Sequence, residues 1–115
     1  MTSDIIKLSA AQLATELKNK NITSQEATQA HLDQIKKTEP QINAFITVSE
    51  EEALNEAKAI DERRAKGEDL HPLAGVPIAV KDIVVTKGIQ TTAASKILEG
   101  WIPPYDASIV TKIKQ

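Results

Sequence analysis

Residues 73–87 read LAGVPIAVKDIVVTK and carry the main prediction about the fold. Successive side chains of a β-strand point to opposite faces, so Val76, Ile78 and Val80 share one face, and Lys81 joins the small residues of the other. A strand that is apolar on both faces suits a sheet covered on both sides, as in α/β proteins. We therefore predict a buried strand with a charged residue at its far end.

Lys81 has two interpretations at this position. A lysine at a strand end commonly extends its ammonium group into solvent, and Asp82 would then be a further surface charge. Alternatively, burial lowers the pKa of a lysine, and the neutral amine can then act as a general base. Composition does not choose between the two interpretations.

The sequence around Lys81 resembles a known enzyme family. The string GVPIAVKD at residues 75–82 is followed by TKG at 86–88, TTAASK at 91–96 and PYDAS at 104–108. This order of motifs is similar to the N-terminal part of the amidase signature family, and the resemblance extends over nearly the whole chain. Within the family it is most similar to the ammonia-releasing subunits of the tRNA-dependent amidotransferases.

The resemblance implies a Ser-Ser-Lys catalytic triad on a mixed sheet flanked by helices, with Lys81 matching the lysine that acts as general base. We interpret Asp82 itself as a supporting residue that orients the backbone or Lys81 and does not react. Ser95 and Ser108 match other family positions, so neither is predicted as a nucleophile. The four glycines, Gly67, Gly75, Gly88 and Gly100, are too far apart to form the family's Gly- and Ser-rich segment. We expect the chain alone to be inactive because both catalytic serines are missing.

For the whole enzyme, the resemblance implies that glutamine supplies ammonia, and that the partner B and C subunits take part in converting Glu-tRNA(Gln) to Gln-tRNA(Gln). ATP would be used by this cytoplasmic complex for protein biosynthesis, and this chain would bind no cofactor. Ile83 stands where the tRNA-dependent members usually carry asparagine, whereas some other members carry an apolar residue there. Two alternatives remain open: a fragment of a small-molecule amidase of the same family, and a non-catalytic interaction module.

Length and composition exclude several other classes. A chain of 115 residues allows at most one domain with a modest core. Its 14 basic and 16 acidic residues give a net charge of -2, which does not indicate a nucleic-acid surface. The absence of cysteine excludes disulfides and thiolate metal sites, and His31 and His71 lack the neighbours of a metal site. No run approaches the roughly 18 apolar residues of a membrane span, so we expect a soluble intracellular protein.

Local signals predict a helical scaffold over residues 1–70, and a truncated start of an α/β core over residues 71–115. This is the fold expected of an N-terminal fragment of the amidase signature fold. Capping-box spacing predicts helix starts at Ser9, with Gln12, and at Thr23, with Glu26.

The remaining elements are predicted from turn, cap and breaker residues. The second helix should close before Pro40, and residues 44–48 should form a short strand. Ser49 should cap a third helix, on which the charged residues 61–66 form a solvated face. A short helical piece is expected around residues 94–98, and Asp106 should cap a last helix.

Overall fold

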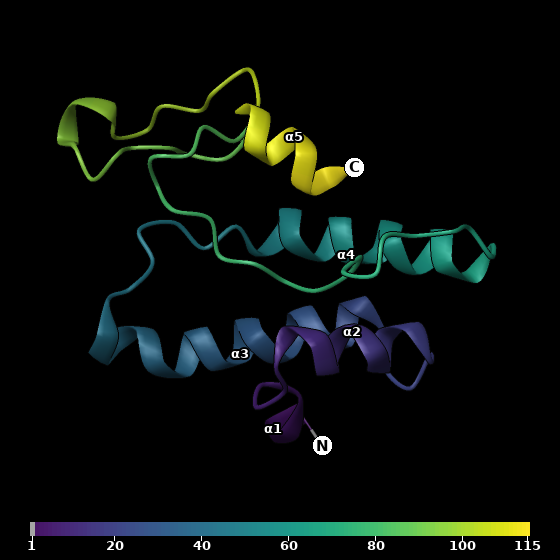
Figure 1. The fold of residues 1–115 in the computed structure, drawn as a ribbon. Coiled ribbons are helices and arrows are strands. Elements are labelled where there is room, and N and C mark those ends of the chain that lie inside the picture. The colour runs from purple at the N-terminus through teal and green to yellow at the C-terminus, as the bar shows by residue number, and fades with distance from the viewer. Residues whose placement is uncertain (1) are drawn as a thin grey trace. The chain divides into compact units, whose positions relative to one another are not determined.

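The computed structural model describes residues 2–115. Within this range the regular elements are all helical (Figure 1). They are the α-helices α1 (Thr2–Ile5), α2 (Ala10–Lys18), α3 (Ser24–Ile42), α4 (Glu50–Ala65) and α5 (Ser108–Lys114), and the 3-10 helix η1 (Lys96–Leu98). None of these helices is long and apolar enough to cross a membrane.

The described chain separates into two compact units. The first contains the residues up to Ala44 and Ser49–Ile78, and the second contains Phe45–Val48 and Ala79–Gln115. Lys81 belongs to the second unit. The domain boundary predicted after residue 70 is not tested by this division and stays a prediction.

Two capping boxes begin the helices of the first unit. The N–H of Ser9 donates to Oε1 of Gln12 at 2.8 Å, and the N–H of Gln12 donates to the Ser9 hydroxyl at 3.3 Å. Thr23 and Glu26 exchange the same pair of bonds at 2.8 and 3.1 Å. Each box satisfies amide groups that have no partner inside a helix, so both predicted starts are confirmed.

The core of the first unit lies where α2 meets the beginning of α3. Leu13, Leu17 and Ala27 are buried there, and the partly buried residues Ile5, Leu8, Ile22 and Val76 pack around them. Helix α3 also packs against α4, which contributes the buried Ala57. Leu13 and Leu17 are one helical turn apart, so one face of α2 points into this core.

Helix α3 is longer than predicted. It continues through Pro40 to Ile42 and ends at Asn43, whose φ of 50° is left-handed. Because Pro40 lies in the last turn, its missing N–H costs the helix a single bond. The N–H of Asn43 closes the end by donating to the carbonyl of Glu39 at 2.8 Å. The predicted end before Pro40 was wrong.

Helix α4 begins after Ser49, as predicted. The cap position at Ser49 is therefore confirmed. However, the Ser49 side chain makes no cap hydrogen bond, so the predicted capping interaction was wrong. Three glutamates in the first turn, Glu50–Glu52, complement the positive end of the helix dipole instead.

The predicted strands are absent from residues 2–115. Residues 44–48 and 76–81 have no regular secondary structure. Ile78, Ala79 and Val80 make no hydrogen bond to any described residue, and the Ile78 and Val80 side chains are 58% and 45% exposed. A strand requires neighbouring strands, and the described chain provides none. The buried strand and the mixed sheet of the predicted α/β class are therefore not seen in residues 2–115, whose regular elements are all helical.

The second unit consists mainly of loops tied together by backbone hydrogen bonds. The N–H groups of Gly88 and Thr91 donate to the carbonyls of Pro103 and Trp101, both at 3.1 Å. Helix α5 buries Val110, and η1 confirms the short helical piece expected near residue 96.

Asp106 does not cap α5. The N-cap position is Ala107, which makes no side-chain cap bond, so this prediction was wrong. Asp106 instead accepts a hydrogen bond from the N–H of Lys87 at 2.7 Å and lies 3.7 Å from the Lys114 ammonium. Its carboxylate therefore joins residue 87 to the last helix of the unit.

Candidate functional site

Lys81 lies directly after the segment that lacks backbone hydrogen bonds. Its side chain is exposed, and its ammonium makes no hydrogen bond or ion pair with any residue of the described chain. Its main-chain carbonyl accepts a bond from the N–H of Val84 at 2.9 Å, which closes a turn. The backbone of Lys81 is therefore anchored on its C-terminal side, and its side chain is free to meet other groups.

Asp82 follows Lys81 in the chain, and its carboxylate is extensively hydrogen-bonded. It accepts bonds from the N–H of Thr92 at 2.9 Å, from the N–H of Ala94 at 3.2 Å, and from the Thr92 hydroxyl. The main-chain carbonyl of Asp82 accepts a further bond from the N–H of Ala93 at 2.9 Å. The whole residue is thus joined to the turn at residues 92–94, which we call the Asp82 turn.

The Asp82 turn has an unusual backbone. Ala93 and Ala94 have φ values of 49° and 56°, a region that residues other than glycine seldom adopt. Two such residues in succession cost free energy, and the bonds to Asp82 offset that cost. Thr92, which begins the turn, is only 4% exposed.

The pKa of Asp82 is lowered by these hydrogen bonds. The Thr92 hydroxyl has the largest effect, followed by the N–H of Thr92, and the N–H of Ala94 adds a smaller one. All three donors stabilise the ionised form.

We expect the Asp82 turn to loosen in acid. Because the carboxyl pKa is lower in the folded state than its usual value of about 3.9, the turn is fully stabilised above that value. The stabilisation is lost as the pH falls from there through the folded pKa. NMR titration of the Thr92 and Ala94 amide protons should show it, and Asp82→Asn should remove the transition. Amide shifts that titrate identically in Asp82→Asn would contradict the expectation.

The other candidate side chains have structural partners. Nδ1 of His31 lies 2.8 Å from the carbonyl of Ala27, and Nδ1 of His71 accepts from the N–H of Leu73 at 3.2 Å. The Ser95 hydroxyl accepts from the N–H of Ile97 at 3.3 Å and caps η1. Residues 2–115 contain no group of three His, Cys, Asp or Glu side chains that could hold a metal ion.

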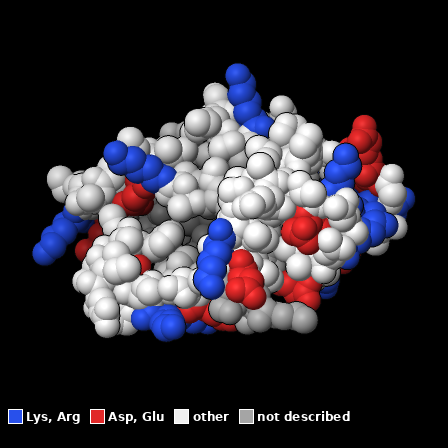
Figure 2. Space-filling view, turned by 60° about the horizontal axis from the view of Figure 1, so that its bottom comes forward, with Lys and Arg blue, Asp and Glu red and all other residues white. Residues whose placement is uncertain are grey.

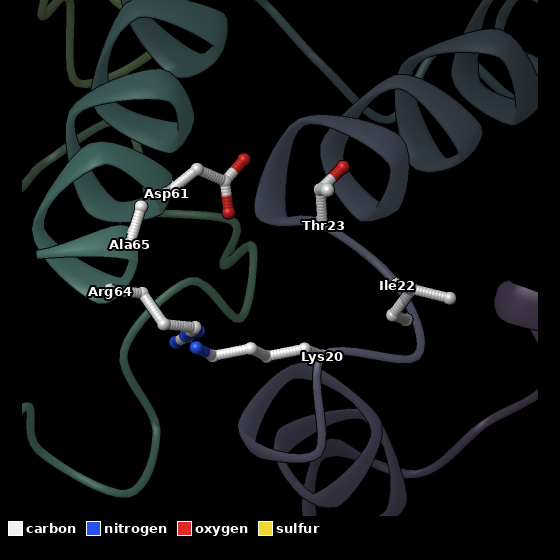
Figure 3. A pocket seen from close by; sticks show the side chains of 6 residues that line it. All are labelled: Lys20, Ile22, Thr23, Asp61, Arg64 and Ala65. Atoms are coloured by element: carbon white, nitrogen blue, oxygen red, sulfur yellow. The ribbon is translucent and has the colours of Figure 1, made fainter. Parts of the chain in front are cut away.

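The first unit contains a cavity of about 320 Å³ (Figure 3). Asp61 on its wall accepts bonds from the N–H groups of Ser24 and Gln25 at 2.8 and 3.0 Å. Arg64 donates to the carbonyls of Ala74 at 2.8 Å and Leu17 at 3.5 Å. The cavity is lined by Lys20, Ile22, Thr23, Asp61, Arg64 and Ala65.

These contacts correct the prediction of a fully solvated face over residues 61–66. Asp61 and Arg64 are half-buried and hold α4 to the start of α3 and the end of α2. No local pattern identifies them, because Asp61 meets partners 36 and 37 positions away. Elsewhere charged side chains lie on the surface, and the face in Figure 2 shows scattered basic and acidic groups interspersed among uncharged residues.

Removing the Asp61 carboxylate should destabilise the first unit. In Asp61→Ala, two amide groups at the start of α3 lose their acceptor, a loss comparable to that of an N-cap, about 1–2 kcal/mol. Glu62→Ala is the matched control, because the Glu62 side chain is exposed and makes no hydrogen bond or ion pair within the described chain. Denaturant unfolding of Asp61→Ala and Glu62→Ala measures the two free energies of unfolding. Equal values for the two variants would contradict the expectation.

Comparison with known proteins identifies the family. Residues 26–115 match the family described as Amidase. The chain belongs to the amidase family. This confirms the family inferred from the residues around Lys81.

The chain is similar to several bacterial amidotransferase subunits. It is 52% and 54% identical to proteins named as the A subunit of glutamyl-tRNA(Gln) amidotransferase from Streptomyces coelicolor and Renibacterium salmoninarum, over 97% of this chain. Its relative of the same name from Paenarthrobacter aurescens is 52% identical over 99% of this chain. The chain spans 22–23% of the length of these relatives.

One solved structure has a similar fold over nearly all of this chain. It comes from a vestigial protein complex described as revealing the evolutionary origins of an s-triazine catabolic enzyme, with an inhibitor bound. It superimposes with a TM-score of 0.88 at 35% identity, over 93% of this chain and 24% of that one. The backbone described above is therefore that of an amidase-family segment.

Proposed function

We propose that this chain forms the N-terminal part of the ammonia-releasing subunit of a glutamyl-tRNA(Gln) amidotransferase. The observation that carries the proposal is its identity of 52–54% with subunits of that name over nearly all of its length. Because the chain corresponds to about a fifth of those relatives, activity belongs to the complete subunit. The chain alone should not hydrolyse amides.

Lys81 is the general base in this proposal. Its neutral amine accepts a proton from one serine, and that serine takes the proton of the second, nucleophilic serine. The nucleophile attacks the carbonyl carbon of the glutamine side-chain amide and the C–N bond breaks. The proton taken up by Lys81 returns to the leaving nitrogen, which departs as ammonia, and water then hydrolyses the acyl-enzyme to glutamate. Both serines belong to the subunit outside these 115 residues, and the free ammonium of Lys81 has no competing partner here.

The exposure of the segment around Lys81 supports the proposal that strands from the rest of the subunit pair with it. Ile78 and Ile83 are 58% and 59% exposed, which is high for branched apolar residues in a folded protein. Further strands that pair with residues 76–81 would bury these side chains and satisfy the backbone. They would also take Lys81 out of water, which favours its neutral, basic form.

The rest of the reaction belongs to the complex. The B and C subunits are the proposed partners, glutamine is the ammonia donor, and ATP is consumed in converting Glu-tRNA(Gln) to Gln-tRNA(Gln). The chain would meet tRNA only through the complex, and its net charge of -2 agrees with this. The proposed location is the cytoplasm.

A small-molecule amidase is the second candidate function. It is favoured by the TM-score of 0.88 to the structure linked to an s-triazine catabolic enzyme. This candidate ranks second because that protein is 35% identical to the chain, whereas the amidotransferase subunits are 52–54% identical. The test is ammonia release by the complete protein, with and without Lys81, from glutamine and from a panel of small amides. Lys81-dependent turnover of small amides without turnover of glutamine would favour the second candidate.

A further inference from the structure

Two successive peptide groups beside Lys81 are fixed by hydrogen bonds. The carbonyl of Lys81 accepts from Val84, and the carbonyl of Asp82 accepts from Ala93, both at 2.9 Å. These carbonyls belong to the peptide planes that follow Lys81 and Asp82. By contrast, the three residues before Lys81 have no hydrogen bond in the described chain. The direction in which the lysine leaves the backbone is therefore set from its C-terminal side.

The anchor of this arrangement is the pair Asp82 and Thr92. The Thr92 hydroxyl donates to the Asp82 carboxylate and accepts from the N–H of Ala94 at 3.1 Å. The same carboxylate accepts the N–H groups of Thr92 and Ala94. Because the left-handed Ala93 and Ala94 depend on these bonds, the turn has one well-defined geometry only while the pair is intact.

We propose that Asp82 and Thr92 are positioning residues for the catalytic lysine, holding the peptide groups next to Lys81 so that its amine meets the serine proton at productive distance. This inference rests on the proposed function of Lys81. Neither residue touches the reacting atoms, and both act through the backbone of Lys81. A displacement of about 1 Å at a reacting group is enough to lower a rate by about 100-fold, so the anchor affects turnover more than binding.

The chain contains a matched control for Thr92. Thr91 and Thr92 are adjacent and each is 4% exposed. The Thr91 hydroxyl donates to the carbonyl of Ile89 at 3.2 Å and does not contact Asp82. Replacing either threonine with valine keeps the shape and removes one buried hydroxyl. Only the Thr92 substitution disturbs the Asp82 turn.

The experiment compares Thr92→Val, Thr91→Val and Thr92→Ser in the complete enzyme, with all its partners present, by steady-state glutamine hydrolysis across pH. We expect Thr92→Val to lower kcat at least about tenfold with KM changed less than about twofold, and to shift the acidic limb of the kcat/KM profile. Thr91→Val should stay within about twofold of the parent in kcat. Thr92→Ser, which keeps the hydroxyl, should restore most of the lost rate.

Equal losses in Thr92→Val and Thr91→Val, or no rescue by Thr92→Ser, would overturn the positioning role. If Thr92→Val fails to assemble, Asp82→Asn replaces it in the experiment, because asparagine keeps the side-chain shape but has a donor in place of one acceptor. An unchanged kcat and pH profile in Asp82→Asn would also overturn the positioning role. Lys81→Ala separates the two proposals. If that variant is inactive while Thr92→Val behaves like Thr91→Val, the proposed function stands and the positioning role fails.

Discussion

Replacing Lys81 with alanine should abolish glutamine hydrolysis by the complete subunit while leaving its assembly intact. The substitution removes the only proposed acceptor for the serine proton, and general-base catalysis contributes about 100- to 10,000-fold to such reactions. The fold should tolerate the change, because the Lys81 side chain is exposed and has no partner in residues 2–115. Ammonia release and gel filtration of the complex measure the two properties.

Lys112→Ala is the control for a lost surface charge. Lys112 is an exposed lysine on α5, and its side chain makes no hydrogen bond or ion pair within the described residues. This variant should retain the parent rate. Ammonia release by Lys81→Ala at the rate of Lys112→Ala would remove Lys81 from the catalytic machinery, and the proposed function would then lose its chemical basis.

The parts of the fold that depend on short-range signals could be predicted from the sequence. A capping box involves residues three positions apart, so Ser9 with Gln12 and Thr23 with Glu26 were sufficient to locate two helix starts. Strands differ because their hydrogen bonds go to another segment. The alternation from Val76 to Val80 indicates how a strand would bury its side chains, but it gives no information about a partner. That is why the predicted strand is not seen in residues 2–115.

The difference between short-range signals and contacts to distant segments also applies to the candidate site. The residues around Lys81 identified the family, and the family model over residues 26–115 confirmed it. The sequence also suggested that Asp82 has a supporting role, and the structure shows its carboxylate bound to the turn ten residues later. The partner itself could not be predicted, because nothing local links Asp82 to Thr92. The left-handed backbone of Ala93 and Ala94 could not be predicted either, because alanine seldom adopts that conformation.

Replacing Gly75 with alanine should strongly destabilise the first unit. Gly75 has a φ of 91°, and a Cβ atom placed there would lie 2.1 Å from Oγ of Ser24. Ser24 is fully buried at the start of α3, so its side chain has little room to move. The left-handed backbone costs about 1–2 kcal/mol for alanine, and overpacking adds about 1–3 kcal/mol. Denaturant unfolding should therefore show a loss of about 2–5 kcal/mol.

Gly67→Ala separates the two contributions. Gly67 has a similar φ of 77°, but a Cβ atom there would meet nothing within 4 Å. This variant should lose only the backbone part, about 1–2 kcal/mol. Ser24→Ala should recover part of the loss in Gly75→Ala, because it removes the clashing oxygen, and the double-mutant cycle gives the coupling free energy. Equal losses in Gly75→Ala and Gly67→Ala, with no coupling to Ser24, would show that the close approach of residues 24 and 75 does not limit stability.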